Sequence, residues 1–129
     1  MRLEAVKEAL DCRVIVGDDR LLEEVQAACG ADLMSDVLSF AAPNTLLLTG
    51  LTTVQTVRTA EIADIRAIVY VRDKLPDKEA VALAREKGII LLATRLTMFE
   101  ACGRLYRCGL RGGSEVAGVR NETRGAPVP

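Results

Sequence analysis

Residues 67–94, "AIVYVRDKLPDKEAVALAREKGIILLAT", decide the fold of this chain. Two apolar runs, at residues 67–71 and 89–94, flank a segment in which small apolar residues recur at helical spacing. Neither run alternates polar with apolar residues, so both faces of each strand are expected to be covered, as in a parallel sheet. Pro76-Asp77 is typical of a helix start and Gly88 of the residue after a helix end. The stretch therefore predicts a strand, a helix and a second strand parallel to the first.

The same pattern continues on both sides of this unit. A third apolar run, "LLLT" from Leu46, precedes it, and a helical segment follows each of the three runs. Thr52-x-x-Gln55 and Thr97-x-x-Glu100 match the capping box, so both threonines are expected to begin helices. The last helix is expected to place four side chains on one face and to end at Gly109; the four are Phe99, Cys102, Leu105 and Tyr106.

The first 45 residues predict shorter elements. These are a helix over 2–10, a strand in "RVIVG" (13–17), a strand within 21–33 and a short helix over 35–41 that Pro43 stops. Together the elements predict an α/β fold, a mostly parallel sheet with helices on both faces, in one domain over residues 1–110. Residues 111–129 have no period and no apolar cluster, so we expect a disordered C-terminal tail.

The composition excludes several classes of function. Half of the 129 residues are hydrophobic, but there are only two Phe, two Tyr and no Trp, so the core is expected to be aliphatic. The 17 basic and 18 acidic residues nearly cancel, which argues against a nucleic-acid or anionic-membrane partner. No apolar run is long enough to span a bilayer. The N-terminal segment contains acidic residues and no uninterrupted apolar core, so it is not expected to be a signal peptide. We therefore expect a cytoplasmic protein.

Catalytic chemistry is not evident in the sequence. There is no His, and no nucleophile elbow, Walker loop or dinucleotide-binding glycine motif is present. The four cysteines have no metal-ligand spacing, so no metal or other cofactor is expected, and they are interpreted as small buried apolar residues. They are Cys12, Cys29, Cys102 and Cys108. The chain is predicted not to be an enzyme.

A ligand site is predicted where the three parallel strands end. Ligands of open parallel sheets bind beyond the carboxyl ends of the strands, against helix N-termini. Three loops should meet at that edge and bring hydroxyls, amides and basic side chains to a phosphorylated ligand. Their candidate residues are Thr49, Gly50, Thr52, Thr53, Arg72, Asp73, Thr94, Arg95 and Thr97. The alternative interpretation is structural, with Thr52 and Thr97 as helix caps and Gly50 in a turn.

A second polar cluster is formed by Asp32, Ser35 and Asp36. Asp32 and Asp36 could share a helix end as a carboxylate pair. The other interpretation is that Ser35 or Asp32 caps the helix over 35–41 and that Asp36 complements its dipole.

The order of these segments resembles the DRTGG domain, in particular its small stand-alone members. The resemblance covers residues 2–110 and depends on two motifs. One is D-x-x-S-D, here Asp32, Ser35 and Asp36. The other is F-x-x-x-x-x-L-Y-x-x-G-L, here Phe99, Leu105, Tyr106, Gly109 and Leu110.

This resemblance implies an α/β fold similar to the N-terminal domain of HPr kinase/phosphorylase. DRTGG domains occur alone, between CBS domains in regulated pyrophosphatases, and within long phosphate acetyltransferases. The chain departs from the family at its name-giving motifs. Leu51-Thr52-Thr53 stands near the D-R position, and Val71-Arg72-Asp73 stands near T-G-G.

The resemblance and the missing catalytic residues together predict a non-catalytic regulatory or oligomerising module. It would act as a homodimer on a partner enzyme. The alternative is a small-molecule sensor that binds a nucleotide or another phosphorylated ligand at the carboxyl ends of the strands.

Overall fold

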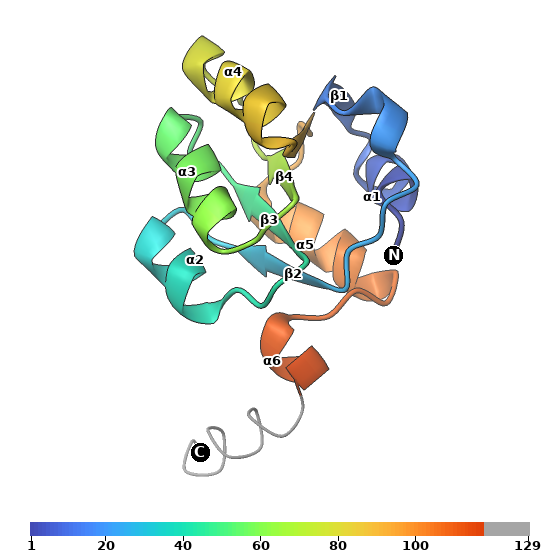
Figure 1. Cartoon of the computed structure of the whole chain (residues 1–129). Helices are drawn as coiled ribbons and strands as arrows, with labels where there is room; N and C mark the ends of the chain where they lie inside the picture. Colours follow the sequence, from blue (N-terminus) through green and yellow to red (C-terminus); the bar gives the residue numbers. More distant parts are fainter. Residues whose placement is uncertain (118–129) are drawn as a thin grey trace.

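The computed structural model describes residues 1–117 and contains one five-stranded sheet in the order β1-β5-β4-β3-β2 (Figure 1). The elements are α1 (Leu3–Leu10), β1 (Arg13–Val16), a 3-10 turn η1 (Asp18–Arg20), β2 (Ala27–Gly30), α2 (Met34–Phe40), β3 (Thr45–Thr49), α3 (Val54–Ile62), β4 (Ala67–Tyr70), α4 (Lys78–Lys87), β5 (Ile90–Ala93), α5 (Met98–Arg107) and α6 (Gly113–Ala117).

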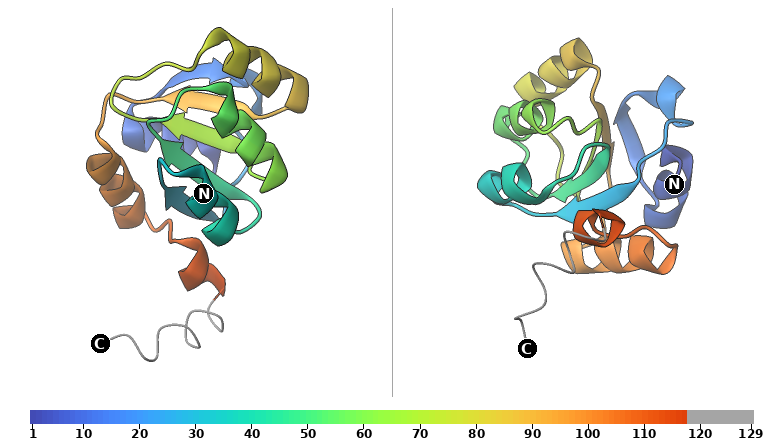
Figure 2. Two further views of the ribbon diagram at one scale, coloured as in Figure 1. Left: turned by 90° about the vertical axis from the view of Figure 1, so that its left-hand side faces the viewer. Right: turned by 60° about the horizontal axis from the view of Figure 1, so that its bottom comes forward.

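Four of the five strands are parallel. β2, β3, β4 and β5 pair in that order with regular register, and β1 joins the free side of β5 in antiparallel orientation. Helices α2, α3 and α4 cover one face of the sheet, and α1 and α5 cover the other (Figures 1 and 2). The predicted α/β fold, with a mostly parallel sheet and helices on both faces, is confirmed.

The core is aliphatic and divides into two layers, one on each face of the sheet. Leu46 and Leu48 pack with α1 and α5, whereas Leu47 between them packs with α2, α3 and α4. This alternation follows from the two-residue period of a strand. Tyr70 is fully buried beneath α3 and α4, and its hydroxyl has no hydrogen-bond partner among the described residues. Burial raises the pKa of this hydroxyl, with the Asp77 carboxylate as a smaller cause.

The helix ends confirm some of the predicted signals and correct one. Gly88 follows α4 with φ of 70°, the left-handed conformation that favours glycine. The Thr97 hydroxyl accepts a hydrogen bond from the Glu100 amide at 3.3 Å, so Thr97 caps α5 as predicted. The capping box at Thr52 is wrong, because Thr53 is the N-cap of α3 and makes no side-chain capping bond. Thr52 lies one residue before the cap, and its carbonyl accepts from the Asp77 amide at 3.0 Å.

The predicted apolar face of the last helix is also partly wrong. Helix α5 buries Ala101 and Leu105, whereas Phe99 is 86% exposed and Tyr106 is 50% exposed. Residues of an α-helix are about 100° apart around its axis, so Phe99 lies about 200° from Ala101 and faces away from the sheet. Cys102 is half-buried.

Residues 111–117 are ordered, contrary to the disorder predicted from Arg111 onward. The Ala28 amide donates to the Arg111 carbonyl at 2.9 Å, and Ala28 pairs with Gly112 in a parallel bridge. The Arg111 guanidinium lies 3.9 Å from the centre of the Tyr106 ring. The free edge of β2 thus supplies backbone partners that the polar sequence does not reveal. The rest of the predicted tail, residues 118–129, lies outside the described residues.

The four cysteines differ in burial. Cys12 is buried and Cys29 is half-buried, but Cys108 is exposed, so the expectation that all four are buried is wrong. Among the helices of residues 1–117, none has the length and apolar character needed to cross a bilayer.

The Ala28–Arg111 contact predicts an effect of truncation. A variant that ends at residue 110 should be less stable than one that ends at residue 117, by about 1–2 kcal/mol, because it loses this backbone bond and the Arg111–Tyr106 stacking. Urea unfolding of the two variants measures the difference. Equal midpoints would show that residues 111–117 contribute nothing to the fold.

The two threonine caps provide a matched pair of substitutions. Thr97→Ala should lower the free energy of unfolding by about 1 kcal/mol, because it removes the hydroxyl that the Glu100 amide contacts. Thr53→Ala should have a much smaller effect, because Thr53 makes no side-chain capping bond. Chemical denaturation of both variants checks this order, and a larger loss for Thr53→Ala would contradict it.

Candidate functional site

The carboxyl ends of β2, β3, β4 and β5 lie along one edge of the sheet, because the four strands are parallel. The loops that follow them carry the predicted ligand-binding residues. The structure divides most of these residues between two sites, one at the ends of β2 and β3 and the other beside β5.

The first site, here called the Asp32 cluster, contains Asp32, Thr49, Gly50 and Arg72. One Asp32 carboxylate oxygen accepts from the Gly50 amide at 2.7 Å and from the Thr49 hydroxyl at 3.1 Å. The other oxygen lies 3.9 Å from an Arg72 guanidinium nitrogen. A Cβ at Gly50 would overlap that guanidinium, so glycine permits the close approach of Arg72.

This geometry corrects the predicted role of the D-x-x-S-D segment. Helix α2 has Leu33 as its N-cap and no side-chain capping bond, so neither Asp32 nor Ser35 caps it. Asp32 instead satisfies backbone and hydroxyl donors at the end of β3, which is the neighbouring strand in space. Asp36 lies in the first turn of α2, where an acidic side chain complements the helix dipole, as the structural interpretation predicted. Ser35 and Asp36 do not join the Asp32 cluster.

The turn after β4 separates the two sites. Arg72 and Asp73 both have left-handed backbone, with φ of 62° and 58°, which is uncommon for residues other than glycine. Two hydrogen bonds hold this conformation: the Arg72 amide donates to the Leu96 carbonyl at 2.8 Å, and the Asp73 amide donates to the Thr94 carbonyl at 2.9 Å. The turn is thereby tied to the loop after β5, and its amides are not available to an anion.

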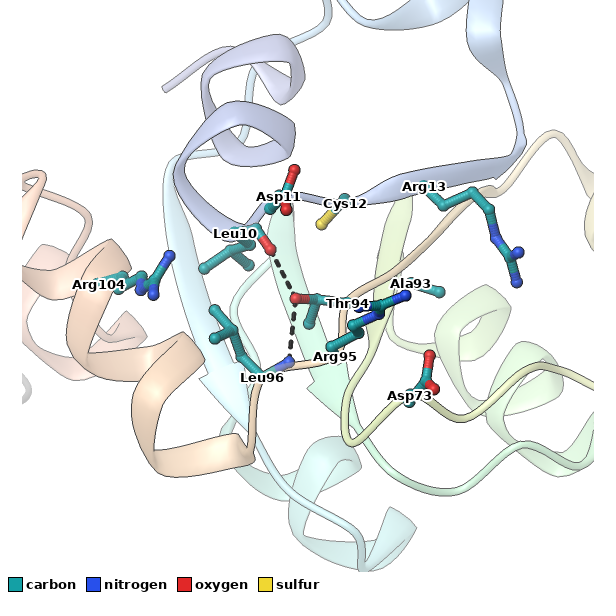
Figure 3. A pocket seen from close by; sticks show the side chains of 10 residues that line it. All are labelled: Leu10, Asp11, Cys12, Arg13, Asp73, Ala93, Thr94, Arg95, Leu96 and Arg104. Atoms are coloured by element: carbon teal, nitrogen blue, oxygen red, sulfur yellow. Dashed lines mark hydrogen bonds between the residues drawn. The ribbon is translucent and has the colours of Figure 1, made fainter.

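The second site, here called the arginine pocket, is a cavity of about 560 Å³ beside the end of β5 (Figure 3). This volume lies within the usual range for small-molecule sites. Its walls come from the end of α1, the start of β1, the turn after β4, the loop after β5 and helix α5. The lining residues are Leu10, Asp11, Cys12, Arg13, Asp73, Ala93, Thr94, Arg95, Leu96 and Arg104.

Hydrogen bonds between distant segments define the shape of the arginine pocket. The buried Thr94 hydroxyl donates to the Leu10 carbonyl at 2.6 Å and accepts from the Leu96 amide at 3.3 Å (Figure 3). Arg104 donates to the Ala9 carbonyl at 3.3 Å. These bonds join α1, α5 and the loop after β5.

The Cys12 thiol does not supply a nucleophile to the pocket. Burial raises the pKa of Cys12 to about 12, and the Asp11 carboxylate adds to this effect. The thiol is therefore protonated at neutral pH, and it is the thiolate that reacts. Within residues 1–117, no group of three or more His, Cys, Asp or Glu side chains is arranged to hold a metal ion.

The structure thus does not gather the predicted ligand residues at one site. Asp73, Thr94 and Arg95 line the arginine pocket, and Thr49, Gly50 and Arg72 belong to the Asp32 cluster. Thr52, Thr53 and Thr97 line neither: they lie at or just before the N-terminal ends of α3 and α5. Arg95 was expected to meet the Thr49–Thr53 loop, but it lines the arginine pocket, and no residue of that loop does so. Ligand binding by any of these residues stays a prediction.

Sequence reasoning did not identify four of the polar or ionisable residues of the arginine pocket. Asp11, Cys12 and Arg13 reach it because β1 returns antiparallel beside β5, and Arg104 reaches it because α5 packs against α1. No local motif marks these positions, and only the spatial arrangement brings them together.

Comparison with solved structures identifies a protein of similar fold. A similar fold occurs in the crystal structure of the CBS and DRTGG domains of the regulatory region of Clostridium perfringens pyrophosphatase, complexed with its activator, diadenosine tetraphosphate. The TM-score is 0.64 and the match covers 79% of this chain, at 14% identity. It covers 44% of that chain, so this chain spans less than half of the regulatory region.

This likeness supports the expected DRTGG-like architecture and, at 14% identity, shows the fold alone. Neither the profiles of known protein families nor the curated protein sequences gave a significant match to this chain.

The Asp32 cluster predicts unequal effects of two substitutions. Asp32→Ala should lower the free energy of unfolding by about 1 kcal/mol, because the Gly50 amide and Thr49 hydroxyl lose their acceptor. Arg72→Ala should cost less than about 0.5 kcal/mol, because its contact with Asp32 is long and half-exposed. Thermal or urea unfolding of both variants measures the two losses. A larger loss for Arg72→Ala would show that the ion pair, and not the hydrogen bonds, holds the cluster.

Proposed function

We propose that this protein is a non-catalytic regulatory module that binds a phosphorylated small molecule in the arginine pocket. The observation that carries the proposal is the presence of three arginines, Arg13, Arg95 and Arg104, around one ligand-sized cavity. Guanidinium groups bind phosphate through paired, charge-assisted hydrogen bonds. The pocket lies beside the carboxyl end of a parallel strand, which is where open α/β sheets bind ligands.

The architecture supports a regulatory role in a second way. The similar solved structure is a regulatory region of an enzyme, and it was determined with a nucleotide activator. From that protein we infer only a general role for this chain, that of a ligand-responsive module that regulates an enzyme. In this proposal the module acts as a homodimer on a partner enzyme. The exposed apolar side chains, of which Phe99 on α5 is 86% exposed, would supply part of the contact surface.

Inorganic phosphate and pyrophosphate test the binding function directly. A ligand at 100 times its dissociation constant stabilises the folded state by about 2.7 kcal/mol, so the melting midpoint should rise by several degrees. Arg95→Ala should reduce this rise strongly. It should leave the midpoint without ligand nearly unchanged, because Arg95 is exposed and makes no hydrogen bond or ion pair within residues 1–117.

Arg58→Ala is the matched control, because Arg58 is an exposed arginine on α3 that does not line the pocket. This variant should keep the full response to phosphate and pyrophosphate. If neither anion shifts the midpoint of the unsubstituted protein, or if Arg95→Ala and Arg58→Ala respond alike, the proposed pocket does not bind phosphate.

A further inference from the structure

The arginine pocket presents carboxylates as well as guanidinium groups. Asp11 and Asp73 line it together with Arg13, Arg95 and Arg104. Among the described residues, no ion pair joins either carboxylate to any of the three arginines. Elsewhere in the described residues, ion pairs do form: Arg20–Glu23, Arg66–Glu23, Arg72–Asp32, Lys87–Glu61 and Arg111–Glu115. Both signs of charge in the pocket therefore remain available to a ligand.

The backbone fixes the position of Asp73 more firmly than that of an ordinary exposed residue. Its amide donates to the Thr94 carbonyl at 2.9 Å, and its φ of 58° places it in the second of two left-handed positions. Thr94 itself is buried and bonded to the Leu10 carbonyl. The base of the Asp73 side chain is thus tied to the residue that precedes Arg95.

The charged side chains come from separate elements and are spread around the pocket. Asp73 lies in the turn after β4, Arg95 in the loop after β5 and Arg104 on α5 (Figure 3). A ligand held by the arginines would leave much of the cavity of about 560 Å³ unfilled if it were only a phosphate group. It would also bring a negative charge near Asp73, which accepts hydrogen bonds but does not donate them when ionised.

A ligand that satisfies both kinds of group must combine a phosphate with hydroxyl donors. The two adjacent hydroxyls of a ribose are such donors, and a carboxylate at the ligand edge of an α/β sheet is suited to accept from them. We propose that Asp73 makes the arginine pocket selective for ribonucleoside phosphates. The arginines bind the phosphate, and the Asp73 carboxylate accepts from the ribose hydroxyls. This inference rests on the proposed function, because it assigns a ligand class to the same pocket.

Isothermal titration with three probes tests the assignment. The probes are adenosine monophosphate, its 2′-deoxy analogue and inorganic phosphate. The unsubstituted protein should bind adenosine monophosphate at least about tenfold more tightly than the deoxy analogue, a difference of about 1.4 kcal/mol, because the analogue lacks one hydroxyl that donates to a charged carboxylate.

The Asp73→Asn variant removes the charge with little risk to the fold, because asparagine tolerates the left-handed backbone as aspartate does. It should lose the preference for the ribonucleotide and bind inorganic phosphate more tightly, because the repulsion is removed. Asp18→Asn, an exposed aspartate in η1 outside the pocket, is the matched control and should bind all three probes like the unsubstituted protein.

The outcomes separate the inference from the proposed function. Suppose that phosphate binds and that Arg95→Ala weakens phosphate binding, but the ribonucleotide and its deoxy analogue bind equally. Asp73 then does not recognise the ribose, and the inference fails while the proposed function stands. The same conclusion follows if Asp73→Asn keeps the ribonucleotide preference. If none of the three probes binds, the proposed function fails as well.

Discussion

Burial of β3, β4 and β5 on both faces constrains every other part of this structure. The described residues of these three strands are buried, and each strand sends alternate side chains into the layers above and below the sheet. Parallel strands also require a crossover that returns the chain to the same end of the sheet, and each crossover here is a helix. The helices that complete the connections are therefore the ones that cover one face. Helices α1 and α5 must then cover the other.

The same constraint places the candidate sites. Because every crossover starts at the same edge, the turn after β4 lies between the loops that follow β3 and β5. The two left-handed residues of that turn are held by the loop after β5, and their side chains belong to different sites. Arg72 approaches Gly50 and Asp32, whereas Asp73 lines the arginine pocket. Left-handed backbone at residues other than glycine costs about 1–3 kcal/mol per residue and persists where neighbouring contacts enforce it. Here two backbone hydrogen bonds supply that enforcement.

The charges of the pocket distinguish it from the Asp32 cluster. In the cluster, the carboxylate is already bonded to a backbone amide and a hydroxyl, so its role is to hold the ends of β2 and β3 together. In the pocket, three arginines and two aspartates share a cavity without pairing among the described residues. Because these charges are not paired with one another, the pocket is suited to a ligand with both acceptor and donor groups.

The amino-acid sequence by itself determined the fold class and much of the order of elements. Long apolar runs without alternation, helical spacing between them, and the signals at Gly88 and Thr97 are local properties, and each one was found where it was expected. The sequence also located part of the pocket, because the strand ends follow from the strands. Asp73, Thr94 and Arg95 could be selected on that ground alone.

Only the tertiary structure decided which polar groups meet. Asp32 stands one residue before the N-cap of α2 and has the local chemistry of a cap, yet it bonds to Thr49 and Gly50, because β2 and β3 are adjacent in space. Arg13 and Arg104 join Arg95 because β1 pairs with β5 and α5 packs on α1. Residues 111–112 are ordered because β2 has a free edge. Local signals arise from neighbours within about four positions along the chain. By contrast, 17 positions separate Asp32 from Thr49, and 84 positions separate Ala28 from Gly112. Their pairing depends on strand order and helix packing, which no short segment encodes.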